Sequence, residues 1–200
     1  MPILENAKQA IERITGVARP SPHDLSHLAR TGCANTYNFE DDGQTPNNPA
    51  FPLIHYLSAV NLPDAFDPAA VFEELFASHG WTNAWRDGIY DCLHFHTRTH
   101  EVLGIARGHG SVQFGGVRGR TLHIKAGDVV VLPAGTGHQR LCASEDFLVV
   151  GAYPEGSRYD EPKPWDVAHD DALAAIAEVK APDTDPVYGK DGPVCKLWLR

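Results

Sequence analysis

Short apolar runs separated by glycine-rich or charged turns fill residues 88–153. The turns include residues 115–120, GGVRGR, and residues 126–128, AGD. Strands of a few residues at this interval are typical of an antiparallel sandwich or barrel. We therefore predict a mainly β core that spans residues 86–153.

The segments before this core show a helical period. Apolar residues line one stripe from Ile3 to Ile14, which predicts an amphipathic helix ending at Gly16. Ser21 then precedes a proline and an acid in the order of an N-terminal cap, which predicts a second helix over residues 22–30. Asp67 and a following proline start a third helix, which should end before Gly80.

The other flanking segments include two predicted strands, a further helix and an apolar tail. Residues 35–39 and 51–60 have strand-like patterns, and turn residues separate them. A further helix is expected near residues 167–179. The chain ends in an apolar tail, residues 194–199, which we expect to pair with a sheet edge or with a second subunit.

Four residues near the centre of the chain have the chemistry of metal ligands. His94 and His96 are two apart in an apolar run, so a strand would point both imidazoles to one face. Glu101 is five residues beyond His96, and polar residues 97–99 must turn or bulge the chain to return it to that face. His138 follows a turn, PAGTG, at residues 133–137.

The spacing resembles the two sequence motifs of the cupins. The fixed positions of the first motif are Gly88, His94, His96, Glu101 and Gly108, and those of the second are Gly127, Pro133, Gly135 and His138. Cys142 stands where the second motif has asparagine, which leaves the ligands intact but removes an amide that could orient them.

Four longer stretches resemble the YjlB-like group of bacterial single-domain cupins over about residues 35–160. They are EDDGQTPNNP, HEVLGIARG, AGDVVVLPAGTGHQRL and DFLVVGAYPEG. The resemblance implies a jelly-roll barrel, the double-stranded β-helix, with helical extensions at both ends. It also implies a metal site formed by His94, His96, Glu101 and His138, but no particular reaction.

Composition agrees with one cytoplasmic domain over residues 1–200, made of an N-terminal part (1–85), the barrel core and a C-terminal part (154–200). The 42% hydrophobic content can fill a sizeable core. A net charge of −9 argues against nucleic acid and anionic membranes as partners. The four cysteines are widely spaced, as in a reduced protein, and we expect no secretion leader or membrane span.

A site with three imidazoles, one carboxylate and no thiolate does not strongly prefer zinc. Manganese, iron and nickel are favoured as the single divalent transition metal, and zinc is possible. Four protein ligands leave open positions for water, dioxygen or substrate, as a catalytic metal needs. The alternative is a cupin shell that keeps the four side chains without a metal.

Strand alternation around the ligands gives further candidates. It places Tyr90 and Arg140 as catalytic or substrate-binding residues, with Cys92 and Cys142 beside the ligands. His100 could reach the cavity mouth, although we expect it to face outward. Trp81 and Trp85 are expected to pack the preceding helix onto the sheet, with the edge of a ligand pocket as the alternative.

Two classes of function fit these observations. The first is a metalloenzyme that oxidises with dioxygen, decarboxylates or isomerises a small polar or acidic metabolite. The second is a non-catalytic binding or sensor module that holds such a molecule in the same cavity. In both cases the partner is a small molecule, and we expect the protein to form a homodimer.

Overall fold

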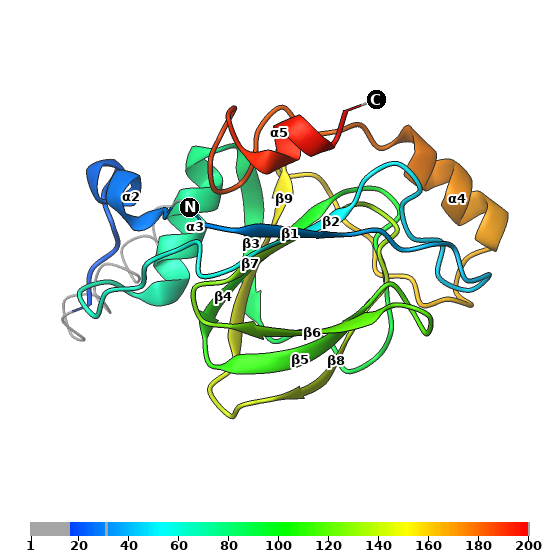
Figure 1. The fold of residues 1–200 in the computed structure, drawn as a ribbon, viewed down its shortest axis with the longest axis horizontal. Helices are drawn as coiled ribbons and strands as arrows, with labels where there is room; N and C mark the ends of the chain where they lie inside the picture. Colours follow the sequence, from blue (N-terminus) through cyan, green and yellow to red (C-terminus); the bar gives the residue numbers. More distant parts are fainter. Residues whose placement is uncertain (1–16, 31, 200) are drawn as a thin grey trace.

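The computed structural model describes residues 17–30 and 32–199, and in this part of the chain two antiparallel sheets form a jelly-roll barrel. The helix expected over residues 3–14 lies outside the described residues. Strands of the larger sheet are ordered β1 (Ala34–Tyr37), β2 (Leu53–Tyr56), β7 (Val129–Leu132), β4 (Glu101–Arg107), β9 (Leu148–Pro154) and β3 (Trp81–Asp87). The smaller sheet has the order β6 (Arg120–Lys125), β5 (His109–Phe114) and β8 (His138–Ala143). Figure 1 shows the two sheets facing each other.

The larger sheet is covered on both faces, and this explains its continuous apolar runs. Along β4, Leu103 and Ile105 belong to the cluster between the two sheets, together with Phe114 of β5. Their neighbours Val102 and Ala106 point the other way into a second cluster, outside the barrel. Glu101 has the same parity as Leu103, so β4 points its carboxylate into the barrel.

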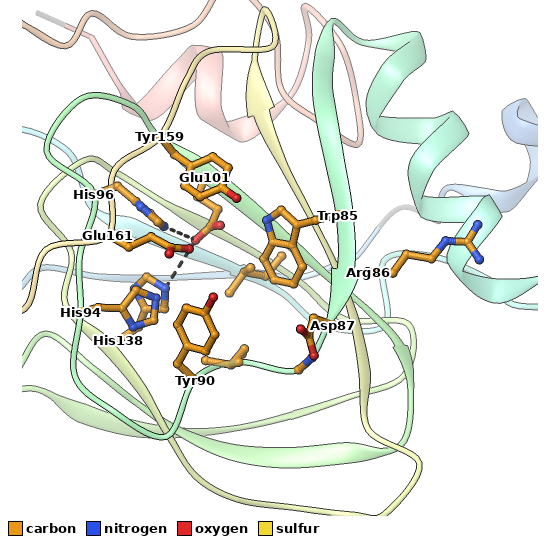
Figure 2. A pocket seen from close by; sticks show the side chains of 13 residues that line it. Trp85, Arg86, Asp87, Tyr90, His94, His96, Glu101, His138, Tyr159 and Glu161 are labelled. Atoms are coloured by element: carbon orange, nitrogen blue, oxygen red, sulfur yellow. Dashed lines mark hydrogen bonds and ion pairs between the residues drawn. The ribbon is translucent and has the colours of Figure 1, made fainter. Parts of the chain in front are cut away.

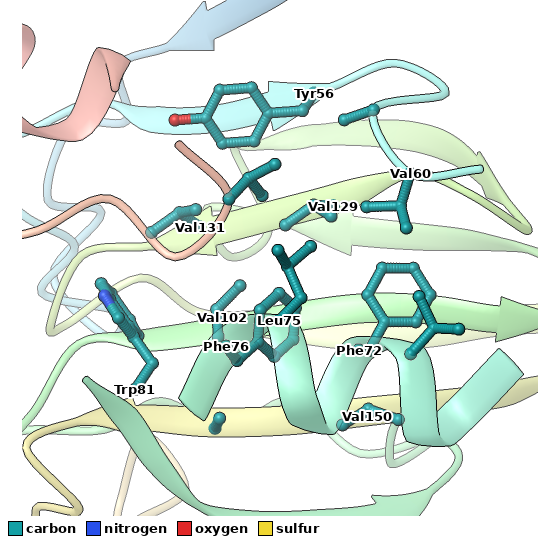
Figure 3. Close-up of a cluster of buried hydrophobic side chains, with 14 of the residues drawn as sticks. Tyr56, Val60, Phe72, Leu75, Phe76, Trp81, Val102, Val129, Val131 and Val150 are labelled. Carbon is teal, nitrogen blue, oxygen red and sulfur yellow. The ribbon is translucent and has the colours of Figure 1, made fainter. Parts of the chain in front are cut away.

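Helix α3 (Pro68–Ser78) packs on the outer face of the larger sheet (Figure 3). Asp67 caps its first turn by accepting a hydrogen bond from the Ala69 amide, as the sequence predicted. Phe72 lies so close to β4 that a β-carbon on Gly104 would come within 2.4 Å of its ring. Glycine at position 104 therefore sets how closely the helix approaches the sheet.

Two other predicted helices are confirmed. Helix α2 (Pro22–Leu28) begins at Ser21, whose side chain and the Asp24 carboxylate form a reciprocal capping box. Helix α4 (His169–Glu178) follows the loop after β9. Within residues 17–30 and 32–199, no helix combines the length and the apolar content that crossing a membrane would require.

The C-terminal tail is helical, so its expected pairing with a sheet edge is wrong, and its pairing with a second subunit stays a prediction. Gly192 and Pro193 provide a helix start, and α5 (Pro193–Leu197) follows. Trp198 is then buried: its ring stacks on Phe51, and its indole N–H donates to the Pro52 carbonyl at 2.9 Å. The tail thus covers the larger sheet instead of extending it.

The buried Asp185 anchors this tail to the barrel. Its carboxylate accepts hydrogen bonds from the Tyr56 hydroxyl of β2 and from the backbone amides of Val187 and Val194. These donors come from three separated segments of the chain. Asp185 therefore holds the start of α5 against β2.

Candidate metal centre

A non-strand segment carries the first two histidines. The strand expected to carry His94 and His96 is wrong, because the segment between β3 and β4 forms only one isolated bridge, between His94 and His138. The two residues exchange backbone hydrogen bonds of 3.2 and 2.9 Å, and the Gly135 amide donates to the His96 carbonyl at 2.7 Å. Backbone bonds between the two motifs therefore place the histidines, and the chain bends at residues 97–98 before β4 begins at Glu101.

Three imidazoles converge inside the barrel (Figure 2). One ligand nitrogen from each of His94, His96 and His138 lies within 4.8 Å of the other two. The Glu101 carboxylate joins them: its Oε2 is 3.1 Å from Nε2 of His96 and 3.5 Å from Nε2 of His138. All four side chains are buried. The structure thus brings together the four residues that the sequence selected.

Each imidazole is held by its Nδ1 atom, which interacts with a backbone carbonyl. The acceptors are the carbonyls of Cys92 for His94 at 3.1 Å, Asp160 for His96, and Thr136 for His138 at 3.1 Å. A carbonyl oxygen can only accept, so each Nδ1 must carry the proton. In the neutral rings the Nε2 lone pairs are then free to bind a metal ion.

Burial and the Glu101 charge act on these rings in opposite directions. Burial lowers the pKa of His94, and burial together with His94 lowers the pKa of His138 well below its usual value. Burial also opposes a charge on His96, but the Glu101 carboxylate and, to a smaller extent, Asp160 together outweigh burial and raise the pKa of His96 to about 9. The reciprocal attraction overcomes burial and lowers the pKa of Glu101.

The donor set fits a divalent transition metal. Ligands about 2.1 Å from a common metal ion lie about 3.0–3.5 Å apart in octahedral or tetrahedral arrangements. The separations from Glu101 to His96 and His138 fall in this range. Four buried nitrogen and oxygen donors without a thiolate suit manganese, iron, nickel or zinc.

A hydrogen-bonded chain behind Glu101 was not found from the sequence. The Tyr153 hydroxyl donates to Oε1 of Glu101 at 3.0 Å, and the Trp85 indole N–H donates to that hydroxyl at 2.9 Å. Gly151 makes room for the indole, because a β-carbon there would lie 2.1 Å from the ring. Tyr153 has the same parity on β9 as Gly151 and Val149, which could have indicated that it faces inward.

His94, His96, Glu101 and His138, the candidate metal ligands, line a cavity of about 170 Å³. Its mouth is formed by aromatic and acidic side chains from two loops: Tyr90 follows β3, and Tyr159 and Glu161 follow β9 (Figure 2). Tyr159 and Glu161 were not found from the sequence, because the loop after residue 154, which is rich in prolines and acids, has no period that indicates which side chains point inward.

The remaining predicted site residues have different positions. Tyr90 does line the cavity, although it lies on a loop rather than a strand. Cys92 contributes its backbone carbonyl to His94, and its thiol is not part of the cavity lining. The Arg140 side chain contacts the loop that carries Tyr90, because its Nε donates to the Ile89 carbonyl at 2.9 Å. Arg140 is not among the residues that line the cavity.

The prediction that Cys142 lies beside the ligands, on the cavity face of its strand, is wrong. Strand β8 pairs with β5 through Arg140 opposite Val112 and Cys142 opposite Ser111, so Leu141 is an extra residue at a bulge. A bulge reverses the alternation of side chains beyond it. Cys142 is therefore exposed beside Ser111 and does not line the cavity.

His100 faces neither the cavity mouth nor the solvent, so both expectations for it are wrong. It is 1% exposed; Nδ1 accepts from the Ala134 amide at 2.9 Å, and Nε2 donates to the Lys180 carbonyl at 3.0 Å. Its ring packs on Trp198. It connects the second motif with the C-terminal segment.

The two tryptophans have separate positions, so their expected shared role is wrong. A register irregularity between Thr82 and Trp85 of β3, where Asn83 has a positive φ of 58°, places the two indoles on opposite faces. Trp81 packs in the outer cluster beneath α3, as expected. Trp85 lines the cavity, which was the alternative.

A jelly-roll barrel whose two motifs direct three histidines and a glutamate into its cavity defines the class: the chain is a cupin. It is 39% identical over 165 residues to "Uncharacterized protein YjlB" of Bacillus subtilis (strain 168), a match that covers 82% of this chain and 96% of YjlB. The chain therefore belongs to the YjlB-like group of cupins. A search of protein-family models gave no match.

Solved structures with partial similarity are more distant in sequence. The WlaRB TDP-quinovose 3,4-ketoisomerase of Campylobacter jejuni is 12% identical with a TM-score of 0.37, covering 46% of this chain and 75% of that one. Acireductone dioxygenase of Bacillus anthracis, with a cadmium ion in its active centre, is 18% identical with a TM-score of 0.34, covering 62% and 77% respectively.

Proposed function

We propose that His94, His96, Glu101 and His138 bind one divalent transition metal, and that the chain is a metalloenzyme acting on a small polar molecule. The observation that supports this most directly is the orientation of the imidazoles. Backbone carbonyls hold all three Nδ1 atoms, so three Nε2 atoms and one carboxylate oxygen meet at the cavity. Manganese, iron and nickel are the favoured ions, and zinc is possible.

The residues around the ligands have separate tasks in this proposal. Tyr153 holds Oε1 of Glu101, which leaves Oε2 for the metal. The cavity of about 170 Å³ limits the substrate to a small molecule. A bound metal with open positions would supply Lewis-acid or redox chemistry, which suits oxidation by dioxygen, decarboxylation or isomerisation.

Metal content by mass spectrometry, measured on untagged protein purified without chelators, tests the metal site. We expect about one equivalent of metal per chain, and we expect His96→Ala and His138→Ala to lose it while keeping the wild-type circular dichroism spectrum. His123→Ala is the matched control, because this exposed histidine on β6 pairs with Ser111 away from the cavity. Full metal in the His96 and His138 variants would disprove the assignment.

Measurement of turnover tests the proposal that the protein is an enzyme. The iron-loaded protein should consume oxygen, or the manganese- or nickel-loaded protein should convert substrate, when screened against small alcohols, amines, acids and thiols. A protein that stays metal-free after reconstitution would instead favour the binding or sensor module.

A further inference from the structure

The charges at the cavity mouth are all negative apart from one arginine that is already paired. Among the lining residues, Glu161 and Asp87 are acids outside the set of proposed ligands. Among the lining residues that the structure describes, Arg86 is the one lysine or arginine, and its side chain points away from the proposed metal ligands (Figure 2). An anionic ligand on its way to the proposed metal would therefore pass two carboxylates, with no unpaired lysine or arginine among the described lining residues.

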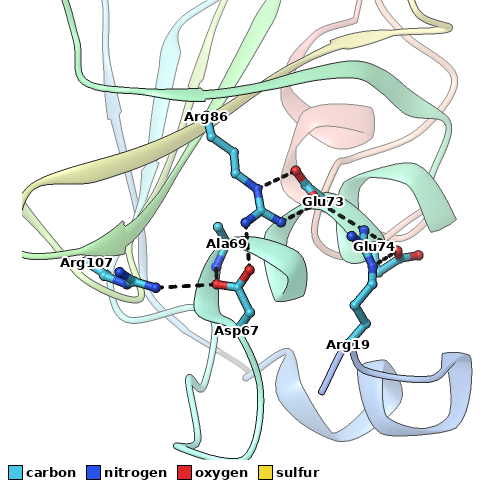
Figure 4. Close-up of polar contacts among 7 residues, drawn as sticks. All are labelled: Arg19, Asp67, Ala69, Glu73, Glu74, Arg86 and Arg107. Carbon is cyan, nitrogen blue, oxygen red and sulfur yellow. Dashed lines mark hydrogen bonds and ion pairs between the residues drawn. The ribbon is translucent and has the colours of Figure 1, made fainter. Parts of the chain in front are cut away.

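Arg86 is fully engaged on the outside of the barrel. Its guanidinium donates two hydrogen bonds to Glu73, at 2.6 and 2.8 Å, and one to Asp67 at 2.6 Å (Figure 4). This two-pronged pairing fixes the planar group against α3. Moving it into the cavity would leave both acids without this partner, so Arg86 is not available to neutralise a ligand.

Aromatic rings complete the mouth. Tyr90, Tyr159 and Trp85 line the cavity, and the faces of such rings attract cations. Tyr159 is held in place because its ring stacks on the buried Tyr153, with centroids 4.5 Å apart. Glu161 lies close enough to Tyr90 for its charge to raise the pKa of that phenol.

The loop that carries Glu161 is fixed on both sides of this residue. On one side, the Asp160 carboxylate accepts two hydrogen bonds from Thr97, at 2.9 and 2.6 Å, and its carbonyl accepts from His96. On the other side, the Pro162 carbonyl accepts from the Phe95 amide at 3.2 Å. The acidic mouth is thus held in position before any ligand binds.

We propose that the cavity selects a small molecule with a cationic ammonium group, which Glu161 and the rings of Tyr90, Tyr159 and Trp85 receive at the mouth. This inference rests on the proposed function, in which the other end of the molecule reaches the metal. It replaces the acidic metabolite that the sequence allowed, because Arg140, the arginine proposed there to bind substrate, does not line the cavity.

Three probes of similar shape test the preference. Choline carries a trimethylammonium group and a hydroxyl, its carbon isostere carries a neutral tert-butyl group instead, and isethionate carries a sulfonate. Binding of each is measured by calorimetric titration or ligand-observed NMR, with zinc-loaded and with metal-free protein. We expect choline to bind at least about fivefold more tightly than the isostere, and isethionate most weakly.

Matched variants test whether the preference for choline over its neutral isostere arises at the mouth of the cavity. Glu161→Gln should remove most of the difference between choline and its isostere, whereas Glu178→Gln, which removes the same charge from the exposed face of α4, should keep it. The proposal is overturned if choline shows no measurable binding, if isethionate binds as tightly as choline, or if Glu161→Gln leaves the preference unchanged.

Zinc content of the same samples separates this outcome from that of the proposed function. Zinc-loaded protein without a preference for choline refutes only the ligand class. Protein that takes up none of zinc, manganese, iron and nickel refutes the metal site. The ligand class is then decided by the metal-free titrations, because residues 85–90 and 159–161 form the mouth.

Discussion

At the scale of single residues, the two oxygens of Glu101 have different partners. Oε2 faces the imidazoles of His96 and His138, and Oε1 accepts the Tyr153 hydroxyl. A ligand whose free oxygen is held in this way keeps its orientation when the metal leaves. Tyr153 is therefore a positioning residue for the proposed metal site.

Replacing Tyr153 with phenylalanine should weaken metal binding without unfolding the protein. Loss of a hydrogen bond behind a metal ligand lowers affinity about 10-fold to 100-fold. Competition with a chelating dye measures the change. Tyr188→Phe is the control, because its hydroxyl donates to the Arg30 carbonyl outside the cavity. Equal affinity in the wild type and Tyr153→Phe would contradict the positioning role.

His100→Ala should have the opposite profile: full metal content but lower stability. The substitution leaves the buried Ala134 amide and the Lys180 carbonyl without their partner in His100, and a buried group without a partner costs about 1–3 kcal/mol. Urea denaturation of this variant beside His123→Ala measures the loss. Metal loss from His100→Ala would mean that this residue supports the site directly.

Single residues also show what the sequence could and could not predict. The residue spacings of the two cupin motifs were sufficient to select His94, His96, Glu101 and His138. The motifs fix which backbone segments meet in the fold. The positions of Cys142 and Trp85 depended on bulges, and one extra residue changes the face of every side chain beyond it. Glu161 and Tyr159 are on a loop, where no period indicates orientation.

At the scale of elements, contact between α3 and β4 depends on the absence of a side chain at position 104. Gly104→Ala should lower the free energy of unfolding by about 1–3 kcal/mol, because the added carbon would overlap the Phe72 ring. Chemical denaturation tests this, with Gly88→Ala as the control, since no atom lies within 4 Å of a β-carbon there.

A double-mutant cycle tests whether overlap with Phe72 causes the loss of stability in Gly104→Ala. Because a smaller residue at position 72 removes the overlap, Gly104→Ala combined with Phe72→Ala should cost less than the sum of the two single substitutions. Additive losses would show that the contact between Gly104 and Phe72 is not responsible.

The capping box of α2 predicts a pH effect. Hydrogen bonds from the side chain and then the backbone of Ser21 lower the pKa of Asp24. A carboxyl group whose pKa is lowered by folding stabilises the folded state above its unfolded pKa, and this contribution is lost as the pH falls through the folded pKa. In Ser21→Ala, the pKa of Asp24 should rise towards its usual value, as measured by NMR titration of its carboxyl carbon. An unchanged pKa would contradict the capping role of Ser21.

At the scale of the whole molecule, the C-terminal segment closes over the larger sheet through Trp198 and Asp185. Trp198→Ala should lower the free energy of unfolding by about 3 kcal/mol or more, because a large buried ring is lost. Leu197→Ala on the same helix removes a 44% exposed side chain and should have little effect. Thermal and urea denaturation measure both, and equal losses would contradict the anchoring role of Trp198.

Self-association also belongs to this scale. The homodimer expected from the sequence stays a prediction, and light scattering after size-exclusion chromatography would test it against the chain mass of 21.8 kDa.

The carbonyl acceptors of the three imidazoles have an evolutionary consequence. Every residue type supplies a backbone carbonyl, so mutations at positions 92, 136 and 160 can change the side chain without removing the acceptor that selects each tautomer. Neighbouring positions such as 90, 159 and 161 can then diverge while the histidines keep their orientation. Descendants of one ancestral barrel could in this way acquire new substrates while retaining the same arrangement of three histidines.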